Sequence, residues 1–157
     1  MMPHLDQLPE ISRNSLLTLP IPQHDTAPFT PLSRPLNESR LAVVTTAGLH
    51  LRDDPPFRGA DPSYRVIPSA SRADEIVQSH ASIGFDRVPV IRDLNVTLPL
   101  DRLRELVSRR ELGGLGPACY SFMGAQRDWS RIEQESAPAV ATRLLAEGVD
   151  TVLLTPT

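Results

Sequence analysis

The sequence lacks most of the features that would assign it at once to a class of protein. It has no lysine, and among its 157 residues it has a single cysteine and only 4% aromatic residues. Its 16 arginines are outnumbered by 19 Asp and Glu residues, and the resulting net charge of −3 excludes a strongly basic nucleic-acid-binding protein. The lone Cys119 can form neither an internal disulfide nor a multi-thiolate zinc site.

Long hydrophobic runs are also missing. No stretch approaches the roughly 18 apolar residues of a membrane helix, and the N-terminus has no basic region followed by an apolar one. We therefore expect a soluble, cytoplasmic protein with no membrane partner. Hydrophobic residues make up 40% and charged residues 22% of the chain, which is typical of one globular domain.

Common catalytic motifs are absent as well. The sequence contains no GxGxxG, GxxxxGK[ST], HExxH or GxSxG pattern. These absences argue against Rossmann-type dinucleotide binding, P-loop nucleotide hydrolysis, zinc proteolysis and ordinary serine hydrolysis. No metal site is predicted.

Proline is concentrated at the start of the chain. Seven of the 16 prolines lie within residues 1–37, a density that predicts neither a helix nor a central strand there. We predict an extended, Pro-rich N-terminal arm over residues 1–39. Its interspersed leucine and isoleucine residues favour packing against its own domain over binding of a partner.

Residues 40–157 are predicted to form one α/β domain. Strands are predicted over 41–46, 64–68, 118–123 and 149–154, and a loop is predicted over 50–62. A helix is predicted from Pro99 to the Gly113–Gly114 pair, and residues 127–147 are predicted to be helical in two pieces. Residues 73–79 fit either a short helix or a strand, and residues 84–92 are ambiguous. This alternation predicts a mostly parallel sheet flanked by helices, in Rossmann-like or flavodoxin-like layers.

The final predicted strand has no helix after it in the sequence. Either this strand lies at a sheet edge, or a covering segment is missing. Ligands of parallel sheets bind beyond the carboxyl ends of the strands, so the loop after this strand is a natural place for chemistry.

Several residues are candidates for a site, and each has a structural alternative. His80 lies between small residues and can exchange protons near neutral pH, but on spacing alone a purely structural histidine is the more common case. Asp93 and Asn95 favour turns and could shape the entry to the following helix. Ser121 and Gly124 end a strand where a ligand can approach the backbone, although core packing explains them as well. Cys119, inside a predicted strand, is interpreted as a buried, inert thiol.

A series of short blocks, in order from residue 40 onwards, carries a family resemblance. The blocks are LAVVTTAG at 41–48, YRVIP at 64–68, SH at 79–80, DLN at 93–95, PLDRL at 99–103, YSFMG at 120–124, GVD at 148–150 and LLTP at 153–156. Together they resemble the selenoprotein B family of the glycine, sarcosine, betaine and D-proline reductases.

The resemblance implies reductive cleavage of a carbon–nitrogen bond α to a carboxylate. In this family a selenocysteine selenolate attacks the α-carbon, and a dithiol or selenoprotein system resets the enzyme. The implied partners are a pyruvoyl-containing subunit that holds the amine substrate, a thiol or selenol redox protein, and a small amine or amino acid. The resemblance does not identify the substrate.

The sequence departs from the family pattern at one place. The family has its selenocysteine, or a cysteine, directly after the strand and turn that here read VLLTPT at 152–157, where this sequence stops. We hypothesise that the reading frame was closed at a UGA codon that encodes selenocysteine. The chain itself would then contain no nucleophile and be inactive alone. His80 becomes the candidate catalytic residue near the selenolate, and Asp93, Asn95, Ser121 and Gly124 become candidates for substrate binding.

Two other interpretations remain open. The chain could be a non-catalytic docking or regulatory subunit of such a complex, which must cover its last apolar strand with its own arm or another chain. A Cys119-dependent enzyme would require that thiol to be exposed and to have a depressed pKa.

Overall fold

The structure is a computed structural model that describes residues 4–18, 25–26, 29–82 and 84–156, and it divides into two compact units at Thr30 and Pro31. The first unit contains a 3₁₀ turn, η1 (Leu5–Gln7), and a helix, α1 (Glu10–Leu17). The prediction that residues 1–37 form no helix is therefore wrong. Pro9 stands at the N-cap of α1, where a missing N–H costs no helical hydrogen bond, so the prolines border this helix instead of interrupting it.

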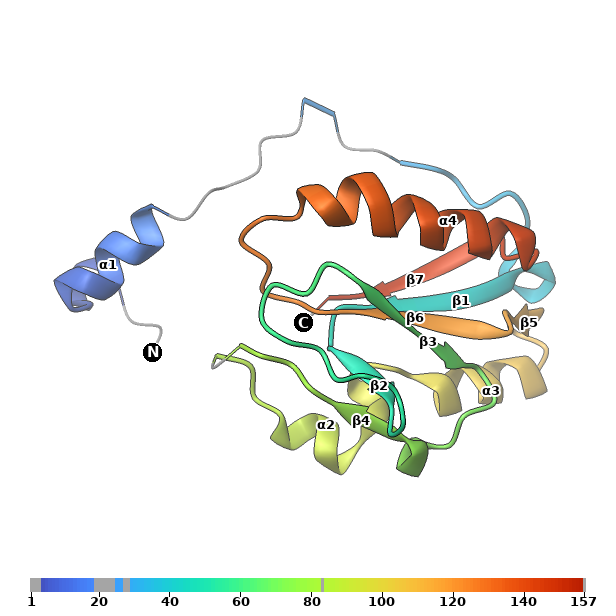
Figure 1. The fold of residues 1–157 in the computed structure, drawn as a ribbon. Helices are drawn as coiled ribbons and strands as arrows, with labels where there is room; N and C mark the ends of the chain where they lie inside the picture. Colours follow the sequence, from blue (N-terminus) through green and yellow to red (C-terminus); the bar gives the residue numbers. More distant parts are fainter. Residues whose placement is uncertain (1–3, 19–24, 27–28, 83, 157) are drawn as a thin grey trace. The chain divides into compact units, whose positions relative to one another are not determined.

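The second unit is built on a five-stranded sheet with β1 (Arg40–Thr45) at its centre (Figure 1). β7 (Thr151–Thr155) runs parallel to β1 along its length, while β5 (Gly114–Leu115) and β6 (Ala118–Phe122) are parallel to successive parts of β1. Because a strand has only two edges, β5 and β6 share the edge opposite β7. β3 (Tyr64–Pro68) pairs antiparallel with β6. The predicted mostly parallel sheet is confirmed.

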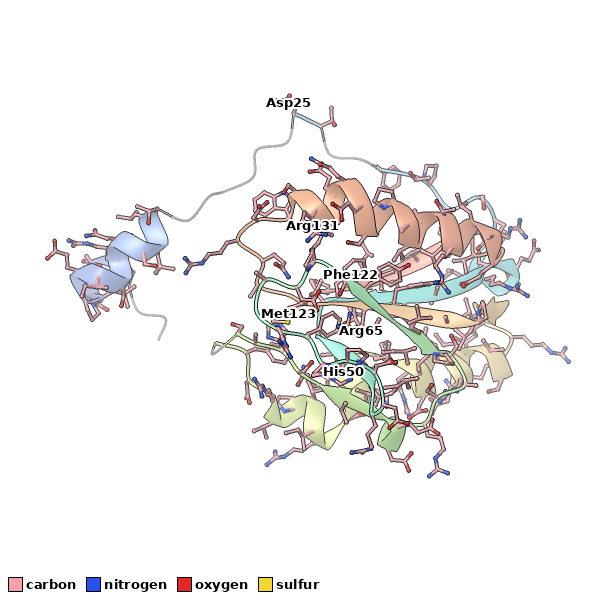
Figure 2. All side chains as sticks on the ribbon, in the orientation of Figure 1. Asp25, His50, Arg65, Phe122, Met123 and Arg131 are labelled. Atoms are coloured by element: carbon pink, nitrogen blue, oxygen red, sulfur yellow. The ribbon has the colours of Figure 1, made fainter. Side chains whose placement is uncertain are left out.

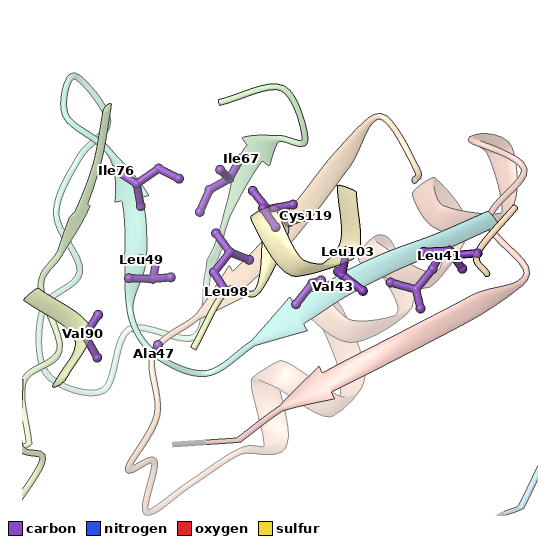
Figure 3. Close-up of a cluster of buried hydrophobic side chains, with 12 residues drawn as sticks. Leu41, Val43, Ala47, Leu49, Ile67, Ile76, Val90, Leu98, Leu103 and Cys119 are labelled. Carbon is purple, nitrogen blue, oxygen red and sulfur yellow. The ribbon is translucent and has the colours of Figure 1, made fainter. Parts of the chain in front are cut away.

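Helices cover both faces of this sheet. α3 (Leu100–Ser108) contributes Leu103 to the cluster that contains Leu41 and Val43 of β1 (Figure 3). α4 (Ala137–Ala146) contributes Val140 and Leu144 to a second cluster on the opposite face. The side chains of β1 alternate between the two clusters, as expected for a strand buried on both faces.

Both predicted helical regions are present. α4 follows a π-helical segment, η5 (Ile132–Ser136), and Pro138 lies in its first turn, where a proline is tolerated. α3 begins directly after Pro99.

A small antiparallel sheet of β2 (Leu49–Leu51) and β4 (Ile76–Gln78) packs beside the main sheet, near α2 (Val88–Arg92). The prediction of a loop over 50–62 is corrected at its start, because His50 and Leu51 belong to β2. Their pairing partner lies more than 20 residues away, beyond the reach of local sequence signals. Residues 73–79, which fit either a helix or a strand, contain η3 (Ala73–Glu75) followed by β4, and the ambiguous residues 84–92 end in α2.

The loop after β2 is fastened by Arg65 of β3. The Arg65 guanidinium donates to the Pro55 carbonyl at 2.8 Å and lies 4.3 Å from the centre of the Phe57 ring. Within the described ranges, no helix has both the length and the apolar character needed to cross a bilayer.

Candidate functional site

The carboxyl ends of the three parallel strands β1, β6 and β7 lie side by side and form the C-terminal edge of the sheet. Thr45, the last residue of β1, is in register with Ser121 of β6 on one side and Thr155 of β7 on the other. The Thr155 hydroxyl donates to the Thr97 carbonyl at 2.8 Å, and the Thr155 carbonyl accepts the Thr46 N–H at 3.2 Å. This edge is where parallel sheets bind ligands.

The segment that carries His80 packs against the residues that follow β1. Ser79 donates its N–H to the Gly48 carbonyl at 3.0 Å. Gly48 has a φ of +64°, and a Cβ there would lie 3.1 Å from the His80 Cα. A glycine is therefore needed at position 48, both for the left-handed backbone and for this close approach.

The His80 imidazole is buried and holds its proton on one defined nitrogen. Its exposed fraction is 2%, and it stacks on the Phe85 ring with the centroids 4.5 Å apart. Its Nδ1 accepts the Ser82 N–H at 3.2 Å, so in the neutral ring the proton is on Nε2. Nε2 is buried and has no hydrogen-bond partner among the described residues.

Two effects lower the pKa of His80: burial of the ring, and the positive charge of Arg87. Arg87 also donates a hydrogen bond to the His80 carbonyl. The ring is therefore held neutral, with an N–H donor that lacks an acceptor. Such a group is suited to donate a hydrogen bond to an anion.

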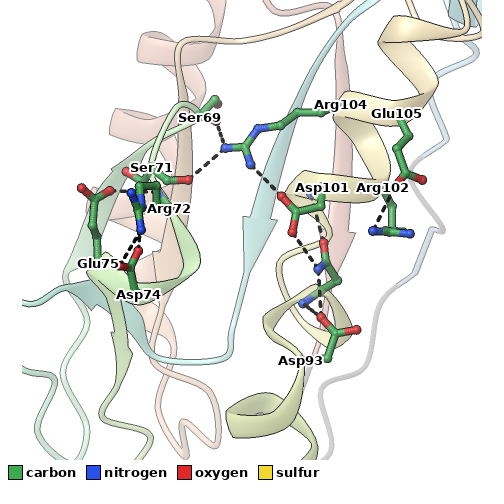
Figure 4. A network of polar contacts seen from close by, with 11 residues as sticks. Ser69, Ser71, Arg72, Asp74, Glu75, Asp93, Asp101, Arg102, Arg104 and Glu105 are labelled. Carbon is green, nitrogen blue, oxygen red and sulfur yellow. Dashed lines mark hydrogen bonds and ion pairs between the residues drawn. The ribbon is translucent and has the colours of Figure 1, made fainter.

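Asp93 and Asn95 form a polar network that shapes the start of α3 (Figure 4). Asp93 Oδ1 accepts both the main-chain N–H and the side-chain amide of Asn95, each at 2.9 Å. Asn95 Oδ1 in turn accepts the N–H of Asp101 at 3.0 Å. These contacts are those of the turn-forming alternative, which accounts for both residues without a ligand.

Arg104 extends this network to the segment after β3. It pairs with Asp101 at 2.8 Å and donates to the carbonyls of Ser69 and Ser71 at 2.7 and 2.9 Å. The network thereby fixes α3 and the 93–95 turn to the main sheet.

Asp93 and Asn95 also line a cavity of about 550 Å³ that reaches β4 and α2. Arg87 and Arg92 border this cavity, as does Gln78, whose Oε1 is buried without a hydrogen-bond partner among the described residues. Arg92 and Gln78 had no sequence signal of their own, because an isolated arginine or glutamine marks no motif. Only the fold shows that they share a cavity with Asp93 and Asn95.

The other two candidates lie elsewhere. Ser121 is fully buried, and its Oγ accepts the Leu49 N–H at 2.8 Å, which is a structural role. Gly124 lines a separate cavity of about 380 Å³ on the α4 side, together with apolar residues that include Phe122, Met123 and Trp129. Figure 2 shows Met123 where β6 ends. The five predicted site residues therefore do not line a common cavity.

Cys119 is a buried thiol, as predicted. It is 1% exposed, and its Sγ lies 3.7 Å from the Ser69 hydroxyl oxygen. Burial raises the pKa of Cys119, so the thiol stays protonated at neutral pH. These features argue against the Cys119-dependent enzyme. Over the described parts of the chain, no three His, Cys, Asp or Glu side chains gather as they would around a metal ion.

Comparison with known proteins gives a consistent result. Residues 12–157 match the family described as "Glycine/sarcosine/betaine reductase selenoprotein B (GRDB)". The chain is 37% identical over 128 residues to the D-proline reductase subunit gamma of Acetoanaerobium sticklandii, an alignment that covers 81% of this chain and 52% of that protein.

Two further relatives are more distant. The glycine reductase complex component B subunit gamma of Carboxydothermus hydrogenoformans is 28% identical, with 92% of this chain and 34% of that protein covered. The sarcosine reductase complex component B subunit beta of Peptoclostridium acidaminophilum is 27% identical, with 88% and 32% covered. No solved structure matches the chain significantly.

The chain thus spans about half the length of the first of these relatives and about a third of the other two. All three are named as subunits of reductases or reductase complexes. The match extends over nearly the whole of this chain, including both strands that flank β1. The chain belongs to the glycine, sarcosine and betaine reductase selenoprotein B family.

Proposed function

We propose that this chain is the N-terminal part of a reductase B subunit that cleaves the carbon–nitrogen bond of a small amino acid or related amine. The observation that carries the proposal is the edge where β1, β6 and β7 end, with the neutral His80 ring in the segment packed against it. The redox residue expected from the family resemblance would follow β7 directly and would therefore lie at this same edge, which supports the proposal.

The redox residue itself would be supplied by polypeptide that follows Thr157. A selenocysteine there would supply a selenolate, which is ionised at neutral pH. Its attack on the carbon that bears the nitrogen would form a selenium–carbon bond as the carbon–nitrogen bond breaks, and the nitrogen would leave as a protonated amine. The residues of this chain would provide the setting for that attack. His80 Nε2–H would donate a hydrogen bond to the selenolate.

The cavity of about 550 Å³ is the proposed place for the substrate. Its volume is within the range of small-molecule sites, and it combines apolar walls with a few polar groups. The Arg92 guanidinium would pair with a carboxylate, and the unpartnered Gln78 Oε1 would accept an N–H. Asp93 and Asn95 would hold the rim of the cavity in place through their turn.

The proposal includes two protein partners. A pyruvoyl-containing subunit would present the amine, and a thiol or selenol redox protein would return the B subunit to its reduced state. The family relatives are named as components of multi-subunit reductases, which supports partners of this kind.

The nucleotide sequence past codon 157 tests the first part of the proposal. We expect an in-frame UGA, followed by a coding stretch that contains a cysteine. A UAA or UAG codon with no continuation would contradict it and favour the docking or regulatory subunit. The partly exposed strand β7 supports that second function, because a partner chain could cover it.

Variants of the full-length protein, assayed with its partner subunits, test the roles of the residues. Arg92→Gln is expected to raise KM with little change in kcat, because it removes binding of the ground state. His80→Gln is expected to lower kcat. Arg131→Gln, at an exposed arginine that directly precedes η5, is the matched control and should change neither. Equal effects of Arg92→Gln and Arg131→Gln on KM would show that the substrate does not bind in this cavity.

A further inference from the structure

Among the described residues, nothing pairs with the main-chain groups along the outer edge of β7. Among the described strands, β7 pairs only with β1. The Thr155 carbonyl accepts the Thr46 N–H, and in a parallel ladder alternate residues direct their main-chain groups to the same neighbour. Thr151, Leu153 and Thr155 therefore bond toward β1, while Val152 and Leu154 direct their N–H and C=O groups away from it.

The side chains of the same two residues are exposed. Val152 is 41% and Leu154 is 68% exposed. Their register with Ala42 and Val44 places them on the α4 face of the sheet, whereas Leu153 packs into the cluster on the α3 face. We call Val152 and Leu154, with their outward main-chain groups, the open β7 surface. It combines an apolar face with a free strand edge, an arrangement that proteins normally cover.

The handedness of the fold fixes which side a following segment would take. The chain passes from β6 across β1 to β7, and the connecting helix α4 covers one face. Crossovers between parallel strands are right-handed in nearly all proteins. A further parallel strand beyond β7 continues in the same direction, so its connecting helix must lie on the α4 face, over Val152 and Leu154.

We propose that the open β7 surface is the docking site for a helix and a parallel strand of this same polypeptide, encoded after residue 157. The helix packs on Val152 and Leu154, and the strand hydrogen-bonds to their main-chain groups. The proposal rests on the continuation described under the proposed function. The family relatives are long enough to contain such a unit, since this chain covers only 52% of one and 34% of another.

Hydrogen exchange of individual amides tests the docking directly. We compare the 157-residue chain with the full-length product of the natural gene. The Leu153 and Thr155 amides are expected to be protected in both forms, because they bond to β1. The Val152 and Leu154 amides should exchange rapidly in the short form and on the order of 100-fold more slowly in the long form.

Rapid exchange of Val152 and Leu154 in the full-length protein would overturn the proposal, as would slow exchange in the short chain alone. A gene that ends at codon 157 would also overturn it, because the helix and strand proposed to dock there would not exist. The measurement needs no activity. A full-length protein with protected amides but no reductase activity would contradict the proposed function and leave the docking site intact.

A pair of variants provides a second test. Leu154→Asp is expected to lower the Tm of the full-length protein by several degrees and to leave the 157-residue chain unchanged. Ile91→Asp, at an exposed position of α2 that is 79% accessible, is the matched control and should have little effect in either form. Equal responses of the short and long forms to Leu154→Asp would contradict docking at this surface.

Discussion

β6 and β7, on opposite edges of β1, differ in burial in the direction opposite to that expected from their hydrophobicity. β6 reads Ala-Cys-Tyr-Ser-Phe and every one of its residues is buried. β7 reads Thr-Val-Leu-Leu-Thr, yet Val152 and Leu154 are exposed. β6 lies between β1 and β3 beneath α4, whereas β7 pairs only with β1 among the described strands. Burial is therefore set by the neighbours of a strand, and hydrophobicity alone does not reveal it.

The polar residues of β6 are buried because their polar atoms are paired. The Tyr120 hydroxyl donates to Glu147 Oε1 at 2.7 Å, and the Ser121 hydroxyl accepts the Leu49 N–H at 2.8 Å. A buried polar group without such a partner would cost stability. β6 thus satisfies its polar groups internally, while β7 has an exposed apolar surface and an outer edge that no other described strand covers.

The largest difference in the free energy of unfolding is expected between a leucine substituted in the covered strand β1 and one substituted in the exposed strand β7. Leu41→Ala, in the buried core of β1, is expected to lower the free energy of unfolding by about 2–5 kcal/mol. Leu154→Ala in the 157-residue chain is expected to change it by less than about 0.5 kcal/mol. Urea denaturation measures both. Similar losses for the two variants would mean that β7 is already covered in this chain.

A smaller effect is expected from the hydroxyl of β6. Ser121→Ala leaves the buried Leu49 N–H without an acceptor, which should cost about 1–3 kcal/mol. Ser108→Ala, at the exposed end of α3, is the control and should be nearly neutral. If Ser121→Ala leaves the urea midpoint unchanged but lowers reductase activity, Ser121 contacts substrate as the sequence suggested.

The smallest expected effect is on the pH dependence of stability. Burial and Arg87 hold the pKa of His80 below its ordinary value of 6.5. As the pH falls below that value, the unfolded chain binds a proton that the folded chain resists, so stability is lost. Between about pH 7.5 and 5.5, the urea midpoint of His80→Gln should therefore fall less than that of the unchanged protein. An equal fall in both would show that His80 is not held neutral.

Much of the fold could be predicted because its signals are local. The strand at 64–68 and the helix after Pro99 have the predicted type because β-branched runs, helical periodicity and glycine stops act within a few residues. β2 was missed because its pairing with β4 is long-range. α1 was missed because the proline count ignored the gap between Pro9 and Pro20, which is long enough for a short helix.

The candidate site was less predictable, because a site depends on which distant residues meet. Sequence could mark His80 as a titratable group, but not its burial or its unpartnered Nε2. Arg92 and Gln78 gain significance only from the cavity that they share. Ser121 and Gly124, three residues apart, are separated by the end of β6: one is fixed in the core and the other lines a different cavity.

The intact mass and selenium content of the natural protein, isolated from its own cells grown with selenium, test the central claim most directly. We predict a species heavier than the 17.3 kDa of this chain, with the isotope pattern of one selenium atom and with fragment ions that locate the selenocysteine directly after Thr157. A natural protein of 17.3 kDa that ends at Thr157 and contains no selenium would contradict the account.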